Sequence, residues 1–163
     1  MPEAPNKDLI TSRIIDAPVA LVWQAWTEPQ HLMKWWGPEY WTSPSATVDL
    51  REGGNYLFCM QAPHDQGGQT AYNVGTYTKI VPYERLEFTQ SLADKDGKKI
   101  NPAEAGMPDN FPSELNMVVT FRAIRDGMTE LTVSEYGWTA GMMYVMSYAG
   151  MNQSLDKLIT GLK

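Results

Sequence analysis

The chain has 163 residues, 43% hydrophobic and 20% charged, which suits a globular domain long enough to bury a sizeable core. A formal net charge of −6 without any basic run excludes binding to nucleic acid and to anionic membranes, and a single cysteine, Cys59, excludes an intramolecular disulfide. Because neither a leader sequence nor a run of about 18 apolar residues occurs, we expect one cytoplasmic domain over residues 1–163, without membrane insertion.

The first half of the chain predicts a strand, two short helices and then a run of strands. The first strand is expected at 7–15. Asp16 is placed to cap a helix that contains Trp23 and Trp26, and Thr27 to cap a second helix that ends at Gly37-Pro38. Strand patterns bounded by turn residues follow at 46–50, 55–61, 72–81 and 85–91.

The second half predicts a long loop at 94–113 with one helical turn near 102–104, two strands at 114–124 and 129–136, and a helix at 141–162. The helix repeats one apolar face at steps of four, three and four: Tyr144, Tyr148, Met151, Leu155, Leu158 and Leu162. Consecutive strands with short turns form an antiparallel sheet. The predicted class is therefore α+β, with a curved antiparallel sheet of six to seven strands wrapped around the C-terminal helix.

Five motifs, in this order, resemble one family: RIIDAPVALVWQAWTEPQHLMKWWGP, EGGNYLF, GTYTKIVPYERLEFT, AEAGMP and NQSLDKLI. Together they resemble the activator-of-heat-shock-protein-90-ATPase-like domains of the START-like (SRPBCC), helix-grip superfamily, from about Leu9 to Leu162. The resemblance implies a helix-grip fold with a cavity between sheet and terminal helix. It does not imply one activity, because relatives include ligand carriers, cyclases, hydrolases and co-chaperones. The family usually has tryptophan where this chain has Met151, which implies a roomier or differently shaped interior.

Residues for metal or nucleophilic chemistry are scarce. Two histidines, His31 and His64, and one cysteine are too few for a zinc site. There is no Gly-x-Ser-x-Gly motif, and Glu52-Gly-Gly-Asn lacks the lysine of a phosphate-binding loop. Cys59 falls on the strand face opposite Tyr56, which indicates a structural thiol. We therefore expect no metal, no cofactor and no nucleophile.

Alternation along the strands and the helix predicts which side chains face the interior. Tyrosine and methionine are frequent there, where leucine or valine would pack a dry core better, and buried hydroxyls need partners, so a ligand cavity competes with a closed core as the interpretation. The predicted lining is Trp41, Tyr56, Phe58, Met60, Tyr77, Phe88, Met117, Val119 and Val133, with Met143, Tyr144, Ser147, Tyr148 and Met151 from the final helix.

Glu135 is the one candidate acid or base. In LTVSEYG, the residues Leu131, Val133 and Glu135 share a face, so an inward strand buries the carboxyl and raises its pKa. Such a group can hold a ligand donor or transfer a proton. The alternative is that the strand ends here and Glu135 reaches solvent.

The tryptophan-rich stretch EPQHLMKWWGPEYWT, residues 28–42, is predicted to divide between core and cavity rim. Trp23 and Trp26 are expected in the core, one of Trp35 and Trp36 inward, and Tyr40 with Trp41 near an entrance. The 94–113 loop is placed to close over the same mouth.

Three functions remain open at this point. The first is a binding protein for a small hydrophobic or aromatic molecule, as a monomer or homodimer. The second is a cyclase- or hydrolase-like enzyme on the same cavity, for which no acid–base pair is apparent. The third is a co-chaperone that stimulates a chaperone ATPase, which the family resemblance suggests. The sequence favours binding over catalysis.

Overall fold

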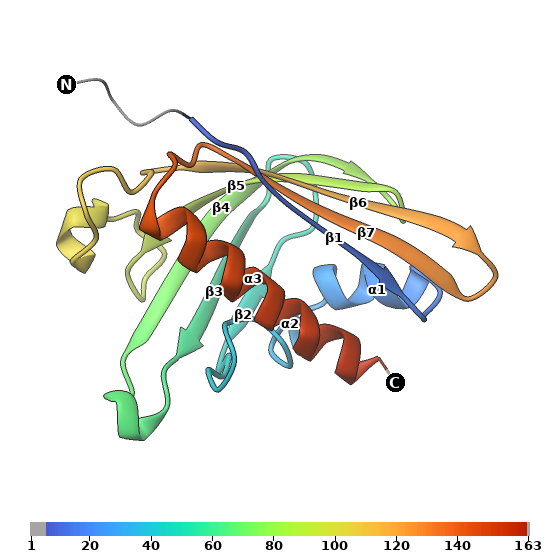
Figure 1. Ribbon diagram of the computed structural model, residues 1–163, viewed down its shortest axis with the longest axis horizontal. Coiled ribbons are helices and arrows are strands. Elements are labelled where there is room, and N and C mark those ends of the chain that lie inside the picture. Colours follow the sequence, from blue (N-terminus) through green and yellow to red (C-terminus); the bar gives the residue numbers. More distant parts are fainter. Residues whose placement is uncertain (1–5, 163) are drawn as a thin grey trace.

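The computed structural model describes residues 6–162, in which one seven-stranded antiparallel sheet curves around a long helix. The strand order is β1-β7-β6-β5-β4-β3-β2, and the helix α3 lies across the concave face (Figure 1). No helix within the described residues is long and apolar enough to cross a membrane. The elements are β1 (Leu9–Ile15), α1 (Val19–Thr27), α2 (Pro29–Leu32), β2 (Ala46–Val48), β3 (Asn55–Gln61), β4 (Thr70–Val81), β5 (Arg85–Ala93), β6 (Leu115–Arg125), β7 (Met128–Tyr136) and α3 (Met142–Gly161), with short 3-10 turns at His64–Gln66 and Pro102–Ala105.

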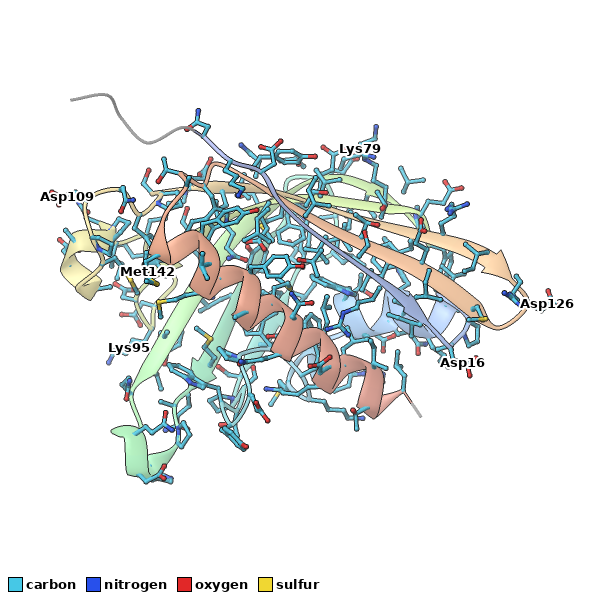
Figure 2. All side chains as sticks on the ribbon, in the orientation of Figure 1. Asp16, Lys79, Lys95, Asp109, Asp126 and Met142 are labelled. Atoms are coloured by element: carbon cyan, nitrogen blue, oxygen red, sulfur yellow. The ribbon has the colours of Figure 1, made fainter. Side chains whose placement is uncertain are left out.

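The predicted α+β, helix-grip class is confirmed, and the strand boundaries agree to within two residues. The two predicted helix caps are wrong. Pro18 occupies the N-cap position of α1 and Glu28 that of α2, each without a side-chain capping bond. Asp16 is exposed (Figure 2), and the hydroxyl of Thr27 donates back to the Trp23 carbonyl oxygen at 2.8 Å. The pattern of residue types predicts that a helix forms. Which residue occupies its N-cap position depends on where the backbone first becomes helical.

Aromatic rings close one half of the concave face. Trp26 of α1 packs on Trp35 with ring centroids 4.8 Å apart, and Trp36 packs on Phe58 at 4.9 Å. Phe58 stacks on Tyr56 at 4.4 Å. The Trp35 indole N–H donates to the Ala25 carbonyl oxygen at 2.8 Å, whereas the indole nitrogens of Trp26 and Trp36 have no partner among the described residues. These packed rings form a closed core that extends from α1 to the centre of the sheet.

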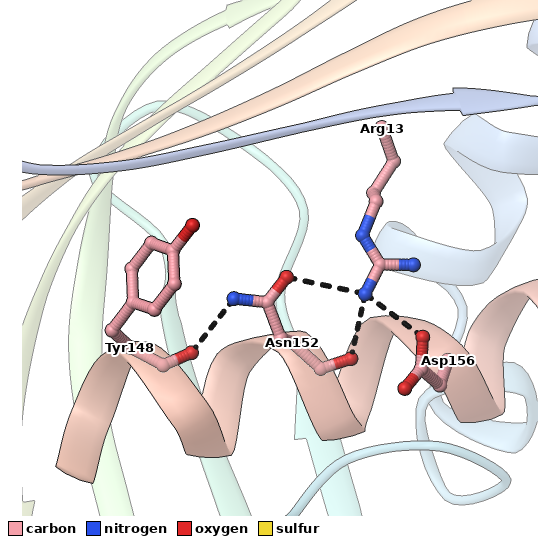
Figure 3. A network of polar contacts seen from close by, with 4 residues as sticks. All are labelled: Arg13, Tyr148, Asn152 and Asp156. Atoms are coloured by element: carbon pink, nitrogen blue, oxygen red, sulfur yellow. Dashed lines mark hydrogen bonds and ion pairs between the residues drawn. The ribbon is translucent and has the colours of Figure 1, made fainter. Parts of the chain in front are cut away.

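The C-terminal half of α3 is buried against the rest of the fold, whereas the side chains of its N-terminal half are only partly buried or exposed. Leu155 and Leu158 are buried, whereas no residue of the segment 142–153 is. On the β1 side, the Arg13 guanidinium donates to the carbonyl oxygen and side-chain oxygen of Asn152 and to Asp156 at 2.8 Å (Figure 3). Only the second half of the helix thus completes the core.

Candidate functional site

A cavity of about 350 Å³ lies between the N-terminal half of α3 and the sheet. Its size is at the lower end of the roughly 300–1,000 Å³ typical of small-molecule sites. Its wall is mostly apolar, and it is formed by Trp36, Gly37, Pro38, Trp41, Met60, Ala71, Asn73, Gln90, Ser91, Leu92, Met107, Phe111, Pro112, Leu115, Glu135, Trp138, Met143, Met146, Ser147, Gly150, Met151 and Ser154.

The cavity exists because small residues face the sheet where α3 crosses it. Ser147, Gly150 and Ser154 recur at steps of three and four, so they share one face of the helix. The Ser154 hydroxyl donates to the Gly37 carbonyl oxygen at 2.7 Å, which holds the Trp36–Trp41 segment close to the helix. Larger residues on this face would fill the space that the aromatic cluster leaves open.

Four polar side chains interrupt the apolar wall on the sheet side: Asn73 of β4, Gln90 and Ser91 of β5, and Glu135 of β7. Asn73 lies opposite Leu92, Gln90 opposite Leu115, and Glu135 opposite Met117. Asn73, Gln90 and Ser91 were not predicted. For Asn73 and Gln90 the signal was the same alternation that singled out Glu135, since Gln90 follows Phe88 by two residues and Asn73 precedes Gly75 and Tyr77 at the same step.

Glu135 is buried, with 4% of its surface exposed, so the structure has the inward one of the two orientations that the sequence left open. Its Oε1 accepts a hydrogen bond of 3.2 Å from the Trp138 indole N–H, while Oε2 has no partner among the described residues. Burial raises the pKa of this carboxyl from 4.5 to about 7, and the bond from Trp138 opposes that shift. A buried acid with an unpartnered oxygen at a cavity wall is a candidate binding or catalytic group.

The structure brings part of the predicted lining to the cavity wall. From the sheet side and its connections these residues are Trp41, Met60 and Glu135, and from α3 they are Met143, Ser147 and Met151. They come from four separate segments of the chain, which the fold places around one space. Their contact with a ligand stays a prediction.

The remaining predicted lining residues lie elsewhere: Tyr56, Phe58, Tyr77, Phe88, Met117, Val119, Val133, Tyr144 and Tyr148. The seven on the sheet do face inward, but into the closed half of the core. The Tyr56 hydroxyl donates to the Thr89 carbonyl oxygen at 2.6 Å, so its partner is the backbone. Alternation determines the face of a strand but not how far along the strand the covering helix lies.

The two helix tyrosines are corrected for a different reason. Tyr148 is 45% exposed, and the hydroxyl of Tyr144 donates to the Asp8 carbonyl oxygen at 3.0 Å, away from the cavity. Each tyrosine follows a wall residue, Met143 or Ser147, by one position, and one position corresponds to a rotation of about 100° around the helix. Tyr144 and Tyr148 therefore lie on the β1 side of α3, while Met143 and Ser147 face the cavity.

The tryptophan-rich segment divides differently from the prediction. Both Trp35 and Trp36 are buried, and Trp36 also lines the cavity. Trp41 lines it too, as expected. Tyr40 is 73% exposed in a left-handed turn, with a φ of 69°, and is not part of the wall.

The long loop between β5 and β6 closes one end of the cavity, as expected for residues 94–113. Met107, Phe111 and Pro112 line the space. The Phe111 ring packs edge-on against Trp138 at 5.3 Å, and the Asn110 amide donates to the Thr139 hydroxyl at 3.3 Å. The loop is thereby joined to the segment that carries Trp138, the hydrogen-bond donor to Glu135.

Lys157 fixes the opposite end of the wall. Its Nζ donates to the carbonyl oxygens of Gly37, Pro38 and Trp41 at 3.0, 3.2 and 2.9 Å, and burial lowers the pKa of this amine. These bonds tie α3 to the segment that ends at Trp41.

We expect Lys157→Met to lower the free energy of unfolding by about 2 kcal/mol, because three carbonyl groups lose a charged donor while the apolar stem is kept. Urea denaturation measures the change. Lys34→Met is the matched control, since Lys34 is an exposed lysine in the same region. Equal effects of the two substitutions would contradict a fixing role for Lys157.

Comparison with known proteins agrees with this architecture. Residues 16–163 match the family described as Activator of Hsp90 ATPase homolog 1-like protein. The chain belongs to this family. None of the curated proteins matches it. The match covers nearly the whole chain and includes β2 to β7, α3 and every segment of the cavity wall, while β1 lies before it.

Solved structures with the same fold come from several bacteria. A protein from Chromobacterium violaceum is 26% identical with a TM-score of 0.77, over 95% of this chain and 96% of that one. One from Nitrosomonas europaea is 26% identical with a TM-score of 0.74, over 95% and 93%. The AHSA1 protein from Silicibacter pomeroyi is 20% identical with a TM-score of 0.75, over 96% and 97%, and shares the fold.

Proposed function

We propose that this member of the family binds a small, largely hydrophobic molecule in the cavity between the sheet and α3. The observation that carries the proposal is a space of about 350 Å³ whose apolar wall holds the buried, partly unpartnered carboxyl of Glu135. Apolar cavities with a few convergent polar groups are the usual sites of small ligands. A closed core would have no reason to keep such a group, because burying an unpaired acid opposes folding.

Binding is favoured over catalysis by what surrounds the carboxyl. Among the residues of 6–162 that line the cavity, Glu135 is the only one whose side chain titrates. Acid–base catalysis of the cyclase or hydrolase type needs a second group to accept or return the proton. One carboxyl beside amides, hydroxyls and thioethers is suited to holding a hydrogen-bond donor in place.

The direct test is mass spectrometry of the purified protein under native and then denaturing conditions. We expect one small molecule bound per chain in the first measurement and lost in the second, since unfolding separates the segments of α3, the sheet and the 94–113 loop that form the wall. Protein that carries nothing is then titrated with tryptophol, a neutral indole alcohol, and followed by protein-observed NMR.

Filling the cavity should abolish this binding. Met151→Trp places a larger ring system in the wall, so we expect tryptophol affinity to fall at least about tenfold while the fold is retained. Met142→Trp is the matched control: the same change on the same helix, at a side chain outside the wall that is exposed to solvent (Figure 2). Equal losses in both variants, or no loss in Met151→Trp, would place the ligand outside the cavity.

Stimulation of a chaperone ATPase is the second candidate, and one surface feature favours it. Met142, Val145 and Met146 are large apolar side chains exposed on the first half of α3. Exposed apolar patches of this kind mark contact surfaces. Chaperone ATP turnover with and without added protein distinguishes the candidates, because substitutions at Met142 or Val145 would remove stimulation and leave tryptophol binding intact.

A further inference from the structure

The charge of the cavity limits which hydrophobic molecule it can take. Its described wall carries one acidic group, Glu135, and no lysine, arginine or histidine. A carboxylate ligand would therefore bring a second negative charge into a space without a compensating cation, and desolvation of that charge would go unbalanced. Anionic ligands such as fatty acids are disfavoured.

The unpartnered atoms of the wall indicate the opposite kind of ligand. Four buried side-chain atoms of the wall have no hydrogen-bond partner among the described residues: Glu135 Oε2, Gln90 Oε1, Ser91 Oγ and Trp36 Nε1. The two carbonyl-type oxygens accept, the hydroxyl can accept or donate, and the indole N–H donates, so Glu135 is the only one of the four that can carry a charge. The Trp138 indole holds the other oxygen of Glu135 at 3.2 Å and so orients the carboxyl. The free oxygen of the one acidic group in the wall therefore lacks a donor.

We propose, on the basis of the proposed function, that the ligand is a hydrophobic molecule with a protonated amine that binds the carboxylate of Glu135. An ammonium group supplies both the donor that Oε2 lacks and the positive charge that the wall lacks. Charge-assisted hydrogen bonds of this type are about twice as strong as neutral ones, and they are strongest where water is excluded. Gln90 then accepts a second donor from the ligand body.

Titration of Glu135 gives the proposal a second readout. Burial raises the pKa of the carboxyl to about 7, so the free protein is mostly protonated at pH 6 and mostly ionised at pH 8. Leu9 and Met117 pair with Glu135 across the sheet, and no other titratable side chain shares the described wall. Amine affinity should therefore rise about tenfold from pH 6 to pH 8, while that of a neutral ligand stays constant.

The experiment compares three probes with one indole body: tryptamine, tryptophol and indoleacetate. Protein-observed NMR titrations at pH 8 give the dissociation constants for the wild type, Glu135→Gln and Glu104→Gln, where Glu104 is an exposed glutamate of the 3-10 turn at Pro102–Ala105. We expect tryptamine to bind at least about tenfold more tightly than tryptophol, and indoleacetate most weakly. Glu135→Gln should remove the advantage of the amine and leave tryptophol within about twofold, and Glu104→Gln should change neither.

The outcomes separate this inference from the proposal on which it rests. If tryptophol binds in the cavity but tryptamine binds no better, or if indoleacetate binds most tightly, the amine preference is wrong and the hydrophobic site stands. The same holds if the advantage of tryptamine survives Glu135→Gln. If none of the three probes shifts resonances of the cavity wall, both proposals fall.

Discussion

Glu135→Gln is expected to raise the free energy of unfolding by about 3 kcal/mol at pH 8 and by less than about 1 kcal/mol at pH 5. The pKa of this carboxyl is about 7 in the folded protein and 4.5 when unperturbed, and each unit corresponds to about 1.4 kcal/mol. The folded state therefore binds the proton more tightly. Wild-type stability falls as pH rises from about 4.5 to 7 and then stays lower by the full amount.

Urea denaturation of both proteins at the two pH values measures this difference. Glutamine keeps an oxygen for the Trp138 indole N–H but cannot ionise, so its advantage should appear only where Glu135 carries a charge. Glu104→Gln, at an exposed position, should show no such dependence. A stability difference that is equal at pH 5 and pH 8 would mean that Glu135 is solvated in the folded protein, contrary to its burial.

A gain in stability of this size on replacing Glu135 would indicate that the carboxyl is kept for function. An acid that destabilises the fold at neutral pH is easily replaced by glutamine, so its presence at the cavity wall indicates a use that outweighs stability. The amine proposal supplies that use, since a bound cation stabilises the ionised carboxyl that the empty cavity does not.

Gly75→Ala is expected to lower the free energy of unfolding by at least about 3 kcal/mol, or to prevent folding, because the site has no room for a methyl group. A Cβ at Gly75 would collide with the carbonyl oxygen of Thr89 and lie 2.7 Å from the Tyr56 ring. The carbonyl belongs to the backbone of β5 and cannot move alone. Thermal and urea unfolding measure the loss.

Gly75 also helps to hold the cavity wall in place. The Tyr56 hydroxyl donates to the Thr89 carbonyl at 2.6 Å, and the Thr76 amide donates to the Thr89 hydroxyl at 3.0 Å, in place of a regular ladder between β4 and β5. Gln90 follows directly and faces the cavity. Gly75 thus permits the close approach that fixes the sheet where a wall residue emerges.

Gly150→Ala is the matched control for this substitution. Gly150 lies inside α3, and a Cβ there would meet only Pro38 at 3.8 Å. Alanine in a helix interior is worth about 0.5–1 kcal/mol over glycine, so stability should rise. Opposite effects of the two substitutions on the free energy of unfolding would show that lack of space at Gly75, rather than backbone entropy, causes the loss of stability there.

Local sequence patterns were sufficient to predict the strands and the long helix, and to single out Glu135 as a candidate site residue. The period of two along β7 placed Glu135 beside Leu131 and Val133, and all three are buried. The strand predicted at 55–61 coincides with β3, and the helical spacing at the C-terminus located α3. These features depend on the spacing of residues that are close together in the chain, so they can be read from the sequence alone.

The sequence by itself thus determined the strands and the long helix, and it singled out Glu135 while leaving open whether its side chain faces inward or reaches solvent. Only the tertiary structure decided which inward residues face open space. Tyr56, Phe58 and Phe88 pack on one another in the closed half, and Trp36 reaches Phe58 from another segment. Gln90 and Glu135 lie where Ser147 and Gly150 of α3 line the cavity. A cavity is the volume left between elements distant in sequence, so no periodicity within one element encodes it.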